Sequence, residues 1–134
     1  MPAPQALFPT FLLLTVALLG LVVYTGLKAK LRLHLALVVL TLLSLALAIV
    51  AALALGKLYD LESAGWITPV HLNLARIATY AYALPAATGV MTLRNRQHRK
   101  LHFRMAMFTL TLTVLAAVTG AWMIFHATPL AAQS

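Results

Sequence analysis

The chain has 134 residues, of which 63% are hydrophobic and only 9% are charged. At a mean hydropathy of +0.95, it carries more apolar surface than a soluble domain of this length can bury, so the composition excludes an ordinary soluble protein and indicates a membrane protein. The sequence contains no cysteine, which excludes disulfides, thiolate ligands and cysteine-based catalysis.

Four apolar runs follow one another along the chain, at residues 7–27, 33–56, 69–93 and 102–126. Each has the roughly 20 residues that a helix needs to cross the hydrocarbon core of a bilayer. The first run lacks a basic segment before it and a convincing cleavage site after it, so we expect a retained span rather than a signal peptide. Short connections favour an all-α integral membrane protein, an antiparallel four-helix bundle that forms a single domain over residues 1–134.

Local signals predict where these helices begin, end and bend. Gly56 should end the second helix, and Thr68 before Pro69 is typical of an N-cap followed by the first helical residue. Pro85 lies inside the third apolar run, where it removes a backbone hydrogen bond. We therefore expect a kink in the third helix.

The net charge of +8 is concentrated in two of the three connections. Basic residues of the first and third connections are Lys28, Lys30, Arg32, Arg94, Arg96, Arg99, Lys100 and Arg104. The second connection holds Lys57 with Asp60 and Glu62. By the positive-inside rule, the basic loops are expected in the cytoplasm, in contact with anionic lipid, and both termini on the outer side. This division between loops argues against a nucleic-acid partner.

Small and polar residues recur at helical spacing in the second and fourth runs. In the second run they share one face with a histidine: His34, Thr41, Ser44, Ala48, Ala51 and Ala52, closed by Leu55. The fourth run has an equivalent face: His102, Met105, Thr109, Thr113, Ala116 and Gly120. Such faces should point inward, where they allow close approach of either a neighbouring helix or a flat ligand.

His34 and His102 begin these two faces near the predicted cytoplasmic ends of their helices. In an up-down bundle the second and fourth helices run in the same direction, so two imidazoles could bind one haem iron from opposite sides. Nearby arginines could bind the haem propionates. The alternative is that both histidines are interfacial residues hydrogen-bonded to loop backbone or water.

The outer half of the third run contains a second group of polar residues. Asn73, Arg76 and Tyr80 share one face, and an arginine in hydrocarbon must be paired, line a wet cavity or reach the surface. Either Asp60 or Glu62 neutralises Arg76, or the face recognises a haem propionate or a quinone head group.

Two other chemistries have weaker support. His71 could ligate a second haem with His126, but this pair would lie at the outer rim of the bilayer. His102, Met105 and Met107 could bind Cu(I), but Met107 lies about 140° from the histidine face. The candidate metal ligands are therefore His34, His102 and His71, with haem better supported than copper.

Catalysis has little support in this sequence. The only carboxylates, Asp60 and Glu62, lie in the predicted outer loop, so no acidic proton relay can cross the membrane. No serine has a recognisable nucleophile and base arrangement. No catalytic residue is therefore predicted, and the chain is expected to act by binding rather than as an enzyme.

The order of the motifs resembles a known family. A basic loop leads into His34, "PVHLNLARIA" opens the third run, "RKLHFRM" contains His102, and "AAVTGAWMI" closes the fourth run. This pattern resembles the small four-span bacterial family of uncharacterised membrane proteins that includes the CtaM-type cytochrome oxidase assembly factors. More distantly, the chain is similar to one half of haem A synthase. The resemblance covers the chain from about Phe8 to His126.

The resemblance implies that His34, His71 and His102 are the recurrent histidines of the family, and that Thr119 and Gly120 are its closing pair. It implies a respiratory-chain accessory protein of the bacterial inner membrane that assists oxidase assembly, with cytochrome oxidase subunits as partners. The alternatives are a haem b electron carrier that reacts with quinone, and a haem-free structural subunit of a larger membrane complex.

Overall fold

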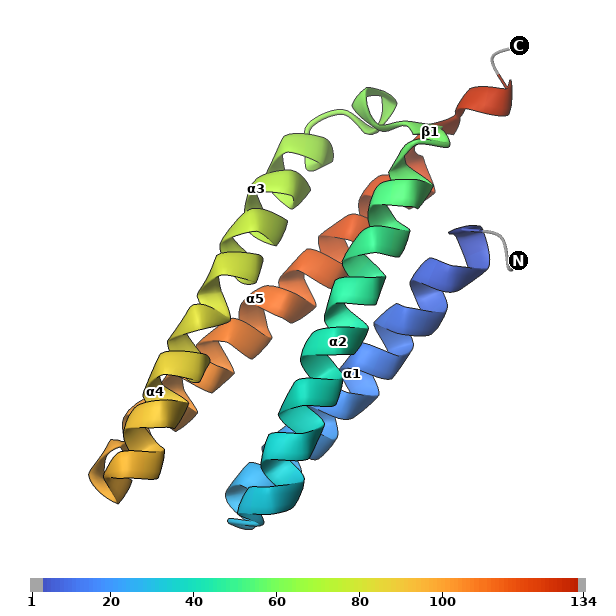
Figure 1. The fold of residues 1–134 in the computed structure, drawn as a ribbon. Helices are drawn as coiled ribbons and strands as arrows, with labels where there is room; N and C mark the ends of the chain where they lie inside the picture. Colours follow the sequence, from blue (N-terminus) through green and yellow to red (C-terminus); the bar gives the residue numbers. More distant parts are fainter. Residues whose placement is uncertain (1–3, 133–134) are drawn as a thin grey trace. The chain divides into compact units, whose positions relative to one another are not determined.

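A computed structural model describes residues 4–132 of the chain, which are almost entirely helical (Figure 1). The all-α prediction is confirmed. The chain forms two compact units, the first made of Met1–Asp60 and Pro129–Ser134 and the second of Leu61–Thr128. Each unit is a pair of antiparallel helical arms.

The first unit is a helical hairpin. Its elements are α1 (Pro4–Leu27), α2 (Leu31–Gly56), β1 (Tyr59–Asp60) and η3 (Leu130–Ala132). One face of α2 is buried: Leu37, Thr41, Ser44, Ala48, Ala51 and Leu55. The Ser44 hydroxyl lies 2.8 Å from that of Thr15 on α1, so this face packs on the neighbouring helix of the hairpin. This face of the second helix is therefore buried, as predicted, and its neighbour within the first unit is α1.

The turn between α1 and α2 needs only three residues because the end of α1 is closed by two backbone hydrogen bonds. Lys30 N donates to the Thr25 carbonyl at 3.0 Å, and Ala29 N donates to the Gly26 carbonyl at 3.2 Å. This is the Schellman pattern, in which the residue after the helix adopts a left-handed conformation and is usually glycine. Here Ala29 adopts it, with φ of 54°.

The second unit contains three α-helices. Its elements are η1 (Leu61–Ala64), α3 (Ile67–Ala81), α4 (Ala83–Arg94), η2 (Arg96–His98) and α5 (Arg99–His126), and the chain then passes through β2 (Thr128–Pro129) back to the first unit. The helix α5 packs along both α3 and α4 (Figure 1). Hydrogen bonds join residue 71 to 119, 81 to 109 and 88 to 102. In all three pairs the two residue numbers add up to the same value. The antiparallel register is therefore continuous from one end of α5 to the other.

The third predicted span is interrupted at Tyr82, between α3 and α4. Pro85 cannot donate a hydrogen bond to the carbonyl of Ala81, four residues earlier. The hydroxyl of Thr109 on α5 donates to this carbonyl instead, at 3.0 Å. The predicted kink is confirmed, and a side chain of the facing helix satisfies the carbonyl that the proline leaves unpaired.

One helix end differs from the sequence prediction, namely the start of α3. The helix α2 ends at Gly56 as expected, whereas the predicted N-cap at Thr68 is wrong. The helix α3 begins at Ile67, and Thr68 lies inside it, where its hydroxyl donates to the Leu61 carbonyl. The acceptor belongs to the η1 turn just before α3. Because the Thr68 hydroxyl binds this carbonyl, it does not cap the helix end.

Three segments within residues 4–132 are long and apolar enough to cross a membrane, namely Gln5–Leu27, Leu31–Gly56 and Arg96–His126. The surface of these segments is rich in leucine and valine, with Leu13 70% exposed and Leu53 66% exposed. Such a surface is compatible with lipid and not with water. The protein therefore has the helices of a membrane protein.

Candidate functional site

The polar centre of the first unit is the imidazole of His34, the fourth residue of α2. Its Nδ1 lies 3.0 Å from the carbonyl oxygen of Val22 and 3.3 Å from the hydroxyl of Thr25. Because a carbonyl oxygen can only accept, Nδ1 carries the ring proton, and the lone pair of the neutral imidazole is on Nε2. The ring edge lies against Gly26, where an added Cβ would be 3.2 Å from Cε1.

His102 in the second unit has the same setting, and it is also the fourth residue of its helix. Its Nδ1 lies 3.2 Å from the hydroxyl of Thr88 on α4. Thr88 donates its single proton to the Leu84 carbonyl at 2.7 Å, so it must accept from the imidazole. The ring edge lies against Gly89, with 3.3 Å between Cε1 and an added Cβ.

His71 repeats the arrangement at the other end of the second unit. Its Nδ1 lies 3.2 Å from the hydroxyl of Thr119, which donates to the Leu115 carbonyl at 2.8 Å. An added Cβ at Gly120 would lie only 2.7 Å from Cε1, so this site requires glycine.

Three histidines thus share one structural motif, which we call the Thr–Gly clasp. In each clasp the imidazole of one helix lies against a threonine and the glycine that follows it on the antiparallel neighbour. The clasps are Thr25–Gly26 with His34, Thr88–Gly89 with His102, and Thr119–Gly120 with His71.

The hydrogen bonds of the three imidazoles follow the pattern that is common for metal-binding histidines. Histidines that bind a metal through Nε2 usually donate Nδ1–H to a carbonyl or another acceptor, which fixes both the tautomer and the orientation of the ring. All three imidazoles donate through Nδ1. This Nδ1 pattern is therefore chemically compatible with binding of a metal or haem iron through Nε2.

The clasps of one unit do not share a ligand. Thr119 and His102 are separated by seventeen residues of α5, or roughly 25 Å of helix, so His71 and His102 lie at opposite ends of the second unit. Among the described residues, no three His, Asp or Glu side chains gather as a metal site. Any metal bound by His71 is therefore distinct from one bound by His102.

The other predicted outer residue, His126, is occupied on its own helix. Its ring stacks on Trp122 with 5.0 Å between centroids, and its Nδ1 lies 2.9 Å from the Trp122 carbonyl. His126 follows Thr119 by seven residues, which is about 10 Å along α5. The structure therefore does not bring it to the clasp of His71.

Positive charge surrounds the clasps near the turns of both hairpins. In the first unit, Lys28, Lys30 and Arg32 are exposed within six residues of His34. In the second unit, the exposed residues near His102 are Arg94, Arg96, Arg99, Lys100 and Arg104. Each unit therefore presents guanidinium or ammonium groups that suit carboxylates or lipid phosphates.

The predicted polar face of α3 lies outside the clasps. Asn73, Arg76 and Tyr80 are all exposed, whereas Ala78 and Ala81 on the same helix are buried. Thr88, which binds His102, follows Arg76 by twelve residues, or roughly 18 Å of helix. The polar face and the His102 clasp are therefore separate places in the second unit.

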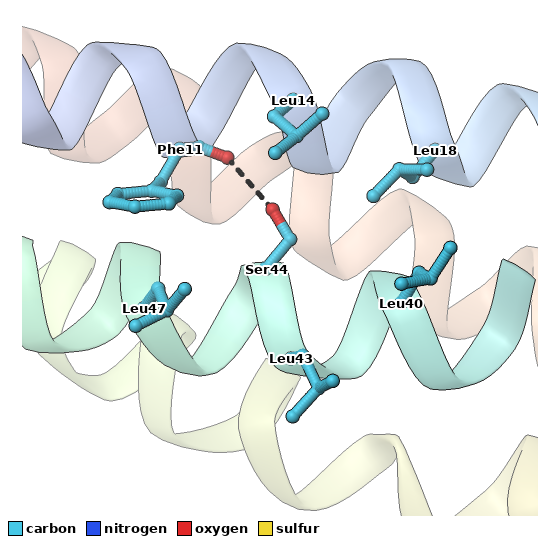
Figure 2. A pocket seen from close by; sticks show the side chains of 7 residues that line it. All are labelled: Phe11, Leu14, Leu18, Leu40, Leu43, Ser44 and Leu47. Atoms are coloured by element: carbon cyan, nitrogen blue, oxygen red, sulfur yellow. Dashed lines mark hydrogen bonds between the residues drawn. The ribbon is translucent and has the colours of Figure 1, made fainter.

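The first unit also has an apolar groove between α1 and α2, with a volume of about 290 Å³. Figure 2 shows its lining, formed by Phe11, Leu14, Leu18, Leu40, Leu43, Ser44 and Leu47. The hydroxyl of Ser44, the one polar side chain, is directed to the Phe11 carbonyl and to Thr15. The groove can accommodate hydrocarbon but offers no polar group to orient a ligand.

The histidines are conspicuous in the sequence, whereas four of their partners were not predicted from it: Thr25, Gly26, Thr88 and Gly89. A signal was present, because three of the six glycines in the chain directly follow a threonine. Those three dipeptides are the three clasps.

Comparison of the chain with models of protein families, with curated proteins and with solved structures finds no match in any of the three. The class of the protein therefore follows from the molecule itself. Within residues 4–132 it is a helical protein with three helices long and apolar enough to cross a membrane and three imidazoles held in Thr–Gly clasps.

Proposed function

We propose that this protein is an accessory membrane protein of a bacterial respiratory chain, which binds haem through His34 and His102 and assists the assembly of cytochrome oxidase. The matched clasps of these two histidines carry the proposal. Both imidazoles belong to the fourth residue of a helix, both donate through Nδ1, and both have the lone pair on Nε2. The role in oxidase assembly comes from the family resemblance of the sequence.

In this proposal His34 and His102 would hold the haem through Nε2, and the basic residues near them would bind its propionates. When bound, the haem would supply a redox-active iron. The Val22 carbonyl with Thr25 on α1, and Thr88 on α4, position the two imidazoles because they lie at the Nδ1 atoms. They would thereby leave Nε2 of each ring to bind the haem. Arg32 and Arg99 are exposed residues close to the two histidines and are candidate partners of the propionates.

The proposed orientation places both hairpin turns in the cytoplasm and both chain ends outside. It rests on eight basic residues in the first and third connections and on the positive-inside rule. Fusion of alkaline phosphatase to the C-terminus should give an active enzyme, and fusion of a fluorescent protein that folds only in the cytoplasm should stay dark. The opposite result would reverse the orientation.

Two other functions have an observation in their favour. Exposed hydrogen-bond donors on α3, Arg76 and Tyr80, would suit a quinone-reactive electron carrier. The contribution of the clasps to helix packing would suit a haem-free structural subunit, in which each imidazole simply joins two helices.

An absorption spectrum of the purified protein, before and after addition of haem b, separates these functions. We expect a Soret band that is lost in both His34→Ala and His102→Ala and kept in His98→Ala, because His98 lies in η2 outside the clasps. A band that shifts when quinol is added would favour the electron carrier. A protein that stays colourless after haem addition, or equal loss from all three substitutions, would refute haem binding at the clasps.

A further inference from the structure

An exposed row of hydrogen-bond donors runs along α3 on the side away from α5. Asn73, Arg76 and Tyr80 occupy positions i, i+3 and i+7, and Tyr80 is 79% exposed. His71 and Ala81 contact α5 from the same helix. The row is therefore a separate face of α3, and its three side chains are directed away from the packed interior of the second unit.

The guanidinium of Arg76 has no hydrogen-bond or ion-pair partner within the second unit as described, residues 61–128. Glu62 is the one acidic residue of this unit, and it is engaged in another interaction. This inference rests on the proposed four-span orientation, in which α3 crosses the membrane. An unpaired guanidinium there is costly, and such residues normally pair with an anion or face a wet cavity. The complement of this face is therefore negatively charged and comes from outside the unit.

The depth of the row decides what kind of anion fits. Arg76 lies nine residues after the start of α3, or roughly 14 Å along the helix, and Tyr80 lies about 6 Å deeper. A lipid phosphate could meet the snorkelling side chain of Arg76 but not the hydroxyl of Tyr80 as well. A helix parallel to α3 could present acceptors at both depths.

Beyond Tyr80, the same face continues with small residues at the spacing of three and four residues that is typical of paired helices. Ala83 and Ala87 on α4 follow Tyr80 by three and seven residues, and both are exposed. Small residues at this spacing allow two membrane helices to approach closely, and polar side chains between them add hydrogen bonds. The acidic residues of this chain are Asp60 and Glu62, and neither lies in an α-helix. A second copy therefore has no helix that carries a carboxylate, and it does not fit.

We propose that the face formed by Asn73, Arg76, Tyr80, Ala83 and Ala87 docks a membrane-spanning helix of another protein, and that an aspartate or glutamate of that helix pairs with Arg76. This surface is separate from the His102 clasp and does not depend on haem. It gives the protein a physical means of binding a membrane partner in either the presence or the absence of a cofactor.

The test uses the full chain in phosphatidylcholine vesicles with two synthetic Leu/Ala membrane helices as probes. One carries a single glutamate at the depth of Arg76, and the other carries glutamine in its place. Energy transfer between labelled chain and labelled helix reports association. We expect the glutamate helix to bind about tenfold more tightly than the glutamine helix, in line with the strongest polar pairs measured between membrane helices.

Substitutions then identify the residue responsible. Arg76→Gln should abolish the preference for glutamate, and Arg94→Gln, an exposed arginine at the end of α4, should leave it intact. Arg76→Glu should transfer the preference to a helix that carries lysine. Because Arg76 is exposed, these variants should retain the helix content of the parent by circular dichroism.

Three results of the binding assay would overturn the proposal. They are equal binding of the two helices, a preference that survives Arg76→Gln, and a preference that disappears when a fifth of the lipid is replaced by phosphatidylglycerol. The last result would show that Arg76 pairs with lipid phosphate. Loss of haem in Arg76→Gln without any change in helix binding would likewise reassign the residue to a propionate.

Discussion

The tightest contact among the three clasps is between His71 and Gly120, and the substitution Gly120→Ala tests it directly. An added Cβ would lie 2.7 Å from Cε1 and 3.2 Å from each ring nitrogen of His71. Non-bonded carbon atoms are normally about 3.5–4.0 Å apart. The imidazole must therefore move by several tenths of an ångström or more, and its hydrogen bond to Thr119 is then lost.

Three contributions determine the expected change in stability. Loss of the hydrogen bond costs about 1 kcal/mol, and crowding of a packed site costs about 1–3 kcal/mol. Alanine gains about 1 kcal/mol over glycine as a helical residue. We therefore expect Gly120→Ala to lower the free energy of unfolding by about 1–3 kcal/mol, against the direction of helix propensity.

The assay is unfolding of the detergent-solubilised protein by dodecyl sulfate, followed by circular dichroism. Gly20→Ala is the matched control, because nothing lies within 4 Å of an added Cβ there and the substitution should gain up to about 1 kcal/mol. In a His71→Ala background the crowding is absent, so Gly120→Ala should become stabilising.

Two results would contradict this reasoning. One is a Gly120→Ala protein as stable as its parent, and the other is an equal loss of stability with and without the His71 side chain. Either would mean that the imidazole does not lie against Gly120.

Three further predictions concern single side chains. Thr109→Val should cost about 1–3 kcal/mol in dodecyl sulfate unfolding because it leaves the buried Ala81 carbonyl unpaired, whereas Thr111→Val on the exposed side of α5 should be nearly neutral, and equal costs would contradict the role of Thr109. Ala29→Gly should raise the free energy of unfolding by about 1 kcal/mol in the same assay, because glycine adopts the left-handed conformation of residue 29 at no steric cost, and a loss of stability would argue against the Schellman turn. Thr88→Val should weaken haem binding in a spectroscopic titration about 10–100-fold through the orientation of His102, and unchanged affinity would show that the clasp plays no part in ligation.

Much of the fold follows from local patterns in the sequence. The apolar runs predicted helices because a segment in hydrocarbon must satisfy its backbone hydrogen bonds internally and have an apolar surface. Pro85 predicted the interruption of the third run because it removes one specific backbone hydrogen bond. The acceptor for Thr68 could not be predicted in the same way. Its hydroxyl binds the Leu61 carbonyl, and only the path of η1 before the helix places that oxygen within reach.

In the candidate site, likewise, the histidines could be predicted from the sequence and their partners on the neighbouring helices could not. His34, His71 and His102 stand out because a histidine in an apolar run is conspicuous. Their partners depend on the register of antiparallel helices, which a one-residue shift would change, so the spacing within any single helix does not reveal them. The contact of Thr109 with the Ala81 carbonyl depends on register in the same way.

That contact has a consequence for the way the protein enters the membrane. During synthesis, α3 and α4 are made before α5, and until α5 arrives the Ala81 carbonyl lacks its partner Thr109. In the proposed four-span orientation, the segment formed by α3 and α4 would therefore be costly to place in lipid on its own. We expect it to remain in the aqueous path of the insertion machinery until Thr109 can reach it. The order of synthesis and the chemistry of one oxygen atom would together make α3, α4 and α5 leave that path as a single group.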